Sequence, residues 1–303
     1  MIIRKCPAQH MTPTYSDKEP TIMKNLKTTT AVLKNQLAER GITMSYYFDR
    51  LGIYFDADTR KENIEILLED NANNKFIWQP LPHNEHLDRK LELFQPNPHC
   101  MVQLTDPDIV AGDCAINYVE FAVDFITDNK KSLEKLVRFF NRHLVYIPSQ
   151  RGSLALNHYH NVNDETVYFT SKGDKKCLLL YSDKPARNAQ HPFCLHIEYR
   201  LACLKQVKNQ NVITIKDLID FDHEQLWNTL LDLRKPNLTE LGVACRNGGT
   251  SRQADHKRGT KEWTAIKSLQ QYLSLHPERE SAFTKISPAN LERCLCDFMK
   301  KPY

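Results

Sequence analysis

Apolar and polar residues alternate along several stretches between residues 45 and 204, which is the period of a β-strand with one buried face. The clearest case is FCLHIEYRL, residues 193–201. Its apolar face holds Phe193, Leu195, Ile197, Tyr199 and Leu201, and its polar face holds Cys194, His196, Glu198 and Arg200. This alternation predicts a strand with one face in the core and the other face either exposed to solvent or part of a functional site.

A second pattern occurs twice, at residues 46–69 and 117–140: an alternating strand, a polar turn and an amphipathic helix. The second copy has Val119, Phe121, Val123 and Phe125 on one face and Glu120, Ala122 and Asp124 on the other; the first has Leu51, Ile53 and Phe55 against Arg50, Gly52, Tyr54 and Asp56. Each apolar face should pack under a helix. Each polar face surrounds a very small residue, which leaves room for a ligand. Asp124 has a simpler interpretation as the N-cap of the following helix.

Further strands are expected at residues 153–162 and in the runs ETVYFTS and CLLLYS, whose connecting turn KGDKK suits a hairpin. The chain then divides into a flexible N-terminal tail (1–44) with room for one short helix, a strand-rich domain (45–204) and a helical region (205–303), whose last helix should begin at Ser287–Pro288. We therefore predict an α+β fold with a mostly antiparallel sheet, helices on one face, and a helical C-terminal region.

The amino-acid composition says little about the functional class of the protein. The chain has 303 residues, 41% of them hydrophobic, and a formal net charge of +4, which by itself does not indicate a nucleic-acid partner. Its nine cysteines include no CxxC pair, so we expect reduced thiols. The N-terminus lacks a signal-peptide core, and no apolar run approaches the roughly 20 residues of a membrane span. These features predict a soluble, cytoplasmic protein.

The predicted polar face gathers metal-ligating side chains. Glu120, Asp124, His196 and Glu198 converge if their strands are neighbours, and carboxylates with imidazoles bind Mg²⁺ or Mn²⁺. We expect the metal at Asp124, Glu120 and His196. A plain ion pair between Glu198 and Arg200 is the structural alternative.

Tyr181 ends the strand that precedes Glu198 in the chain, and Lys184 follows three residues later. A free tyrosine has a pKa near 10, so attack on a phosphodiester near neutral pH needs help. A metal would polarise the phosphate, and Lys184 would stabilise the phenolate and the phosphate oxygens. The alternative is a packed aromatic residue at a strand end.

The order of these motifs resembles the rolling-circle replication initiation factors, the trans-acting Rep proteins of small plasmids and filamentous-type phages. That family has a strand pair of the form TxYxGSxxSxxxxRxYDK and then a strand with Glu-h-Arg. Here the pattern reads TVYFTSKGDKKCLLLYSDK and LHIEYRL, preceded by VEFAVDF. The resemblance covers roughly residues 45–205. It departs from the family pattern at Thr170, Leu179 and Ser182.

The resemblance implies a metal-dependent endonuclease and strand transferase. A tyrosine would nick one DNA strand, stay attached to the 5′-phosphate and leave a 3′-hydroxyl. Tyr181 fits this role best and Tyr168 is the alternative; Glu198 matches the family's strand carboxylate, and Asp124 matches the acidic residue of the first core strand. On this interpretation residues 45–204 form the nicking domain, and replication-origin DNA, a host helicase and a second copy of the chain are candidate partners.

Two further motifs are open to both interpretations. The spacing in His158-Tyr159-His160 places both imidazoles on one strand face, as in metal-binding pairs or in ordinary surface histidines. The segment 234–267 is rich in lysine and arginine. It is either a solvated loop or a DNA-phosphate contact through Arg246, Arg252, Lys257, Arg258 and Lys261.

Three functions remain from the sequence. The favoured one is a rolling-circle replication initiator. A non-catalytic DNA-binding or regulatory protein on the same scaffold is the alternative, since the departures from the family pattern lie within the tyrosine motif. A conjugative relaxase would use the same chemistry.

Overall fold

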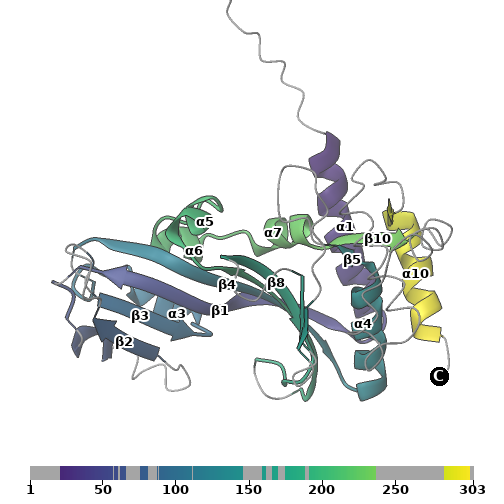
Figure 1. Ribbon diagram of the computed structural model, residues 1–303, viewed down its shortest axis with the longest axis horizontal. Coiled ribbons are helices and arrows are strands. Elements are labelled where there is room, and N and C mark those ends of the chain that lie inside the picture. Colours follow the sequence, from purple (N-terminus) through teal and green to yellow (C-terminus); the bar gives the residue numbers. More distant parts are fainter. Residues whose placement is uncertain are drawn as a thin grey trace, which may run out of the picture.

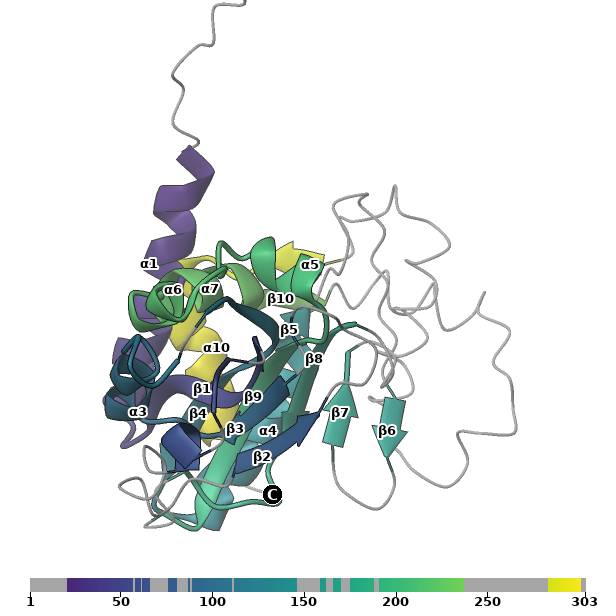
Figure 2. The same ribbon diagram turned by 90° about the vertical axis from the view of Figure 1, so that its left-hand side faces the viewer.

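The protein has an α+β architecture built on one large antiparallel sheet, as the sequence predicts (Figures 1 and 2). The computed structural model describes residues 21–56, 58–60, 62–65, 76–80, 87, 89–110, 112–145, 159–161, 166–169, 175–187, 191–236 and 283–300. The described strands of the large sheet follow the order β2-β3-β1-β4-β9-β8-β7-β6, and every neighbouring pair is antiparallel.

The strands of the large sheet are β1 (Thr43–Phe55), β2 (Phe76–Pro80), β3 (Arg89–Phe94), β4 (Cys114–Thr127), β6 (Tyr159–Asn161), β7 (Thr166–Tyr168), β8 (Lys176–Tyr181) and β9 (Phe193–Leu201). A small sheet has the order β11-β10-β5 and consists of β5 (Leu144–Val145), β10 (Asp232–Pro236) and β11 (Phe283–Lys285). The helices are α1 (Thr21–Ala38), α3 (Pro98–Gln103), α4 (Lys130–His143), α5 (Leu204–Lys208), α6 (Ile215–Ile219), α7 (His223–Leu230) and α10 (Pro288–Lys300).

The core lies between the apolar face of the central strands and the helices. Phe121 of β4 is fully buried, and its ring contacts those of Phe48 (centroids 5.5 Å apart) and Phe221 (4.7 Å). Farther along β4, Phe125 packs on Phe140 of α4 at 4.6 Å. Figure 1 shows α5, α6 and α7 along one side of the long central strands. The alternation in the sequence thus correctly predicts which face of β4 and β9 is apolar and buried.

Helix starts follow local capping chemistry. The side chain of Asn129 accepts a hydrogen bond from the Ser132 amide at 2.8 Å and caps α4. Asp124 therefore does not cap this helix. Helix α10 begins at Pro288, as expected, and the Ser287 carbonyl accepts the Leu291 amide at 3.0 Å.

Two segments differ from the expectation. Residues 21–38, in the segment predicted to be a flexible tail, form α1, which buries Leu33 and Leu37 one helical turn apart. The C-terminal region, predicted to be helical, also contains β10 and β11. Strand β10 pairs with both β5 and β11, and it buries Leu233 against the core. Strands of three to five residues are too short for their alternation to stand out in a sequence. Among the described residues, no helix combines the length and apolar character of a membrane span.

Replacing Phe121 with alanine should destabilise the protein by about 3–5 kcal/mol, because it removes buried aromatic contacts and leaves a cavity. Ile77→Ala is the matched control, since Ile77 is 44% exposed on β2 and should change the free energy of unfolding by less than about 0.5 kcal/mol. Urea unfolding followed by circular dichroism measures both. Equal effects of the two substitutions would contradict this placement of the core.

Candidate functional site

The polar face of the sheet carries a buried set of charged side chains on three adjacent strands. The register of β4 and β9 pairs Glu120 with Arg200 and Asp124 with His196, and the register of β8 and β9 pairs Tyr181 with His196. Asp124 and Glu198 lie on neighbouring strands, but they are not directly opposite, because Glu198 pairs with Ala122.

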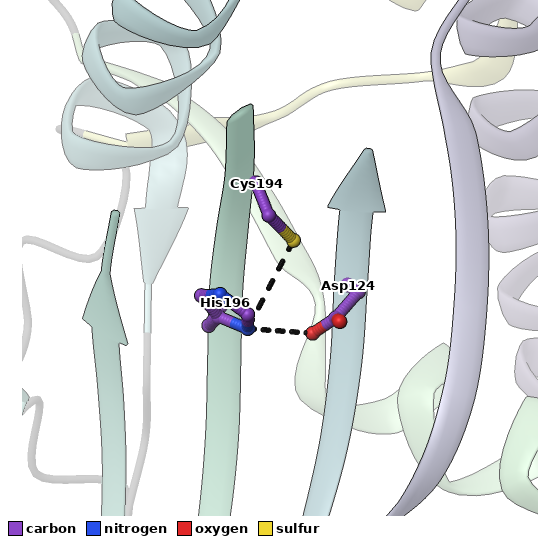
Figure 3. Close-up of side chains that lie close together, drawn as sticks. All are labelled: Asp124, Cys194 and His196. Atoms are coloured by element: carbon purple, nitrogen blue, oxygen red, sulfur yellow. Dashed lines mark hydrogen bonds and ion pairs between the residues drawn. The ribbon is translucent and has the colours of Figure 1, made fainter. Parts of the chain in front are cut away.

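Asp124 and His196 form one centre (Figure 3). His196 Nδ1 lies 2.7 Å from Asp124 Oδ1, and Nε2 lies 3.1 Å from the backbone oxygen of Lys184. Both neighbours are acceptors, an arrangement that favours the imidazolium form, in which both ring nitrogens donate. Burial alone lowers the pKa of His196, but the hydrogen bond and charge of Asp124 outweigh burial and raise it. The hydroxyl of Tyr47 donates to the same Asp124 oxygen at 3.0 Å.

Tyr181 connects this centre to Glu198. Its hydroxyl donates a hydrogen bond to Glu198 Oε1, and its ring stacks on the His196 imidazole with centroids 4.7 Å apart. The ammonium of Lys184 lies 5.0 Å from the centroid of the Tyr181 ring. Tyr181 is only 6% exposed, and burial, together with the charge of Glu198, raises its pKa well above the ordinary value. The phenol is therefore protonated in the protein as it stands.

A second group consists of three carboxylates. Asp49, Glu120 and Glu198 each offer an oxygen, and these oxygens all lie within 4.8 Å of one another. Arg200 pairs with two of them, with Glu198 Oε2 at 2.7 Å and with Glu120 Oε1 at 3.1 Å. Burial raises the pKa of Glu120 to about 7; the Arg200 charge opposes this shift and the Glu198 charge adds to it. Arg50 also interacts with the charge of Glu120, so two guanidinium groups face three carboxylates.

Asp49 reaches this group because of a β-bulge. The register between β1 and β4 shifts between Phe48 and Arg50, so Asp49 is an extra residue in β1 and the polar face gains a carboxylate. Gln95 holds it in place: the Gln95 amide nitrogen Nε2 donates to Asp49 Oδ1 at 2.9 Å, and the Gln95 backbone amide donates to the Asp49 carbonyl at 2.7 Å. The sequence contains a signal for the bulge, since two polar residues separate the buried Phe48 and Leu51.

The residues expected to share one metal site fall into two groups. Asp124 and His196 group with Cys194, whereas Glu120 groups with Asp49 and Glu198. Lys184 and Glu198 lie beside Tyr181. Three further residues that the sequence pattern does not single out lie at the site: Asp49, Tyr47 and Arg187. The Arg187 guanidinium lies 5.1 Å from the Tyr47 ring centroid.

Several other candidates lie outside what the structure describes. The basic residues Arg246, Arg252, Lys257, Arg258 and Lys261 belong to the segment 237–282, which is outside the described residues. His158 is outside them too. For His160 and Tyr168 only the backbone is described, in the edge strand β6 and in β7. Tyr168 pairs with Leu179 of β8, which is two residues from Tyr181.

The chain was compared with protein-family models, curated proteins and solved structures. No protein-family model matches the sequence, and no curated protein matches it significantly. Among solved structures, a rolling circle replication initiator protein from Geobacillus stearothermophilus is similar over 75% of this chain and 97% of its own, with 12% identity and a TM-score of 0.33. The regulatory subunit of aspartate kinase from Thermus flavus is similar over 56% of this chain and 95% of its own, with 8% identity and a TM-score of 0.19. Both TM-scores are too low to establish a shared fold.

The raised pKa of Glu120 makes a prediction about pH. The unfolded chain loses this proton near pH 4.3 and the folded protein near pH 7, so ionisation penalises the folded state increasingly across that interval. Glu120→Gln removes the penalty. We compare the free energy of unfolding of Glu120→Gln with that of the natural protein in the presence of a chelator. The difference, variant minus natural protein, should increase by more than about 1 kcal/mol between pH 4.5 and pH 7.5.

Urea unfolding at a series of pH values measures this difference. Glu292→Gln, which alters an exposed glutamate on α10, should give a flat difference over the same interval. A flat profile for Glu120→Gln as well would show that Glu120 ionises normally in the folded protein.

Proposed function

We propose that this protein is a metal-dependent DNA endonuclease and strand transferase of the rolling-circle replication type, with Tyr181 as the nucleophile. One observation carries the proposal: the Tyr181 hydroxyl donates its hydrogen bond to the buried carboxylate of Glu198, within a group of three carboxylates and beside the ammonium of Lys184. A nucleophile bonded to a base and flanked by groups that can stabilise charge is the arrangement that covalent catalysis needs. The motif resemblance from the sequence supports the same chemistry.

The proton and bond changes in the proposed reaction balance without a further reactant. Tyr181 Oη attacks the phosphorus of a DNA phosphodiester and gives its proton to Glu198. The bond from phosphorus to the 3′-oxygen breaks, and that oxygen leaves as a hydroxyl after it takes a proton from Glu198. The 5′-phosphate stays on Tyr181, and a 3′-hydroxyl attacking the same phosphorus reverses the step and rejoins a strand.

Positive charge has to appear near the phenol for this reaction, because burial and Glu198 keep Tyr181 protonated. Lys184 is exposed and close to the ring. The His196 imidazolium stacks on the same ring at 4.7 Å. Cations this close favour the phenolate over the phenol, and an incoming phosphate meets them at the mouth of the site.

The group of Asp49, Glu120 and Glu198 fits a divalent cation such as Mg²⁺ or Mn²⁺. Three hard carboxylate oxygens lie close together, and Arg200 pairs with two of the three carboxylates. Bound there, the cation would supply Lewis-acid polarisation of a phosphate oxygen. Asp124 and His196 fit less well, since the imidazole nitrogens already donate to Asp124 and to the Lys184 carbonyl.

Recognition of an origin is assigned to the C-terminal region, as a proposal from the sequence. The buried polar face offers little area for reading duplex DNA, whereas specific recognition buries on the order of 1,000 Å² of protein surface. Phosphate contacts are proposed for the basic residues between Arg246 and Lys261. DNA is the proposed partner throughout, and a host helicase and a homodimer remain candidates from the family resemblance.

A non-catalytic DNA-binding protein is the second candidate. The burial of Tyr181 favours it, because a hydroxyl that is packed and bonded to Glu198 also describes a structural tyrosine. The two candidates differ in one outcome: only the nicking enzyme becomes covalently joined to DNA.

Tyr181→Phe should abolish formation of a covalent adduct with single-stranded DNA in the presence of Mn²⁺, because it removes the attacking oxygen and little else. DNA affinity and the far-ultraviolet circular dichroism spectrum should persist. Denaturing gel electrophoresis with end-labelled DNA detects the adduct, and Tyr168→Phe is the matched control. An adduct that survives in Tyr181→Phe and disappears in Tyr168→Phe would move the nucleophile to Tyr168. No adduct from the natural protein would favour the non-catalytic candidate.

Asp49→Asn should weaken Mn²⁺ binding at least about tenfold, which corresponds to about 1.4 kcal/mol, because it removes one of three charges and keeps the shape. Isothermal titration calorimetry with Mn²⁺ alone measures this. Asp183→Asn removes an exposed carboxylate near Tyr181 and should bind Mn²⁺ like the natural protein. A loss of affinity in Asp124→Asn but not in Asp49→Asn would place the metal at Asp124, Cys194 and His196 instead.

A further inference from the structure

The segment between β8 and β9 carries Lys184, the cation that the proposed reaction places beside Tyr181. Two of its backbone groups contact the Asp124–His196 pair. The Lys184 carbonyl lies 3.1 Å from His196 Nε2, and the Arg187 amide donates to Asp124 Oδ2 at 3.4 Å. A third contact closes the loop on itself, since the Ala186 amide donates to the His191 carbonyl at 3.0 Å.

The side chain of Arg187 ties the same loop to the segment that follows β3. Its Nη2 donates to the carbonyls of Gln95 at 2.6 Å and Pro96 at 3.0 Å, which follow β3. Gln95 also holds Asp49 of the carboxylate group. The loop is therefore held at two places. The Asp124–His196 pair holds its backbone at Lys184 and Arg187, and the segment after β3 holds the Arg187 side chain.

Every polar atom of this pair has a protein partner in the loop or the sheet. His196 uses one ring nitrogen for Asp124 and the other for Lys184. Asp124 accepts from Tyr47 and His196 on one oxygen and from Arg187 on the other. Asp124 is 1% exposed and His196 is 3% exposed. Side chains satisfied and buried to this degree are suited to holding the backbone in one position.

We propose that Asp124 and His196 are positioning residues, which anchor the loop between β8 and β9 so that Lys184 lies over Tyr181 where the scissile phosphate binds. This inference rests on the proposed function and deepens it. An exposed lysine has a large rotamer entropy, so its usefulness depends on a fixed backbone. A displacement of about 1 Å at a reacting centre can lower the rate about 100-fold.

Two substitutions of His196 separate its two hydrogen bonds. The amide nitrogen of glutamine reaches roughly the place of Nε2, so His196→Gln keeps a donor for the Lys184 carbonyl. The amide nitrogen of asparagine reaches roughly the place of Nδ1, so His196→Asn keeps only the donor for Asp124. We expect His196→Asn to slow single-turnover adduct formation by about 10- to 100-fold at saturating Mn²⁺ and DNA. His196→Gln should recover part of that rate, because it restores the anchor for the Lys184 carbonyl but not the imidazolium charge beside Tyr181. DNA affinity should change little in either variant.

Coupling to Lys184 tests whether the pair acts through that residue. Lys184→Ala should slow adduct formation in the natural background and have little further effect in His196→Asn, because the anchor and the anchored group act as one unit. The proposal would be overturned if Lys184→Ala slowed the reaction by the same factor in the His196→Asn background as in the natural protein. Equal rates in the asparagine and glutamine variants would overturn it as well. A weakened Mn²⁺ affinity in both variants would instead make His196 a metal ligand.

Hydrogen exchange gives a readout that does not depend on catalysis. The amides of Ser182, Asp183, Lys184, Ala186 and Arg187 should exchange at least about tenfold faster in His196→Asn than in His196→Gln, since only the latter holds the Lys184 carbonyl. Unchanged exchange in both variants would overturn the anchoring role even if adducts form. If the natural protein forms no adduct but the exchange difference is present, the proposed function fails while the anchor stands, and Lys184 is held for another purpose.

Discussion

The buried carboxylates of β4 and β9 require partners, and this constraint shapes the polar half of the molecule. Glu120, Asp124 and Glu198 are each no more than 4% exposed. A buried charge without a partner costs several kcal/mol, and breaking a buried pair costs about 3–5 kcal/mol. Arg200 serves two of these groups, and the imidazolium of His196 serves the third. The arrangement is under-neutralised at Asp49, Glu120 and Glu198, and that excess of negative charge is what a divalent cation would relieve.

The same constraint gives Tyr181 its character. Its hydroxyl is one of the donors that satisfy Glu198, so the proton that must leave a nucleophilic tyrosine already points at a base. The stacked imidazolium and the ammonium of Lys184 add positive charge at the ring. The contacts that pack Tyr181 are thus the same contacts that the proposed reaction uses.

The alternation of apolar and polar residues in the sequence predicts much of the fold. The apolar and polar faces of β4 and β9, the β7–β8 hairpin and the start of α10 all follow from the residue pattern. The grouping of the polar residues does not, because it depends on register. A one-residue bulge brings Asp49 into the carboxylate group, and direct pairing joins Asp124 to His196 rather than to Glu198. The adjacent polar residues Asp49 and Arg50 mark where the alternation breaks, but the residues that then lie opposite each other depend on tertiary contacts such as those of Gln95.

The central claim is that Tyr181 becomes joined to a DNA 5′-phosphate. The most direct measurement is mass spectrometry of peptides from the protein after incubation with single-stranded origin DNA and Mn²⁺, followed by digestion with nuclease and protease. The account predicts that a peptide containing Tyr181 gains the mass of a 5′-phosphorylated nucleotide and that fragmentation places it on the Tyr181 oxygen. The same mass on the peptide of Tyr168, or unmodified tyrosines alongside cleaved DNA, would contradict it.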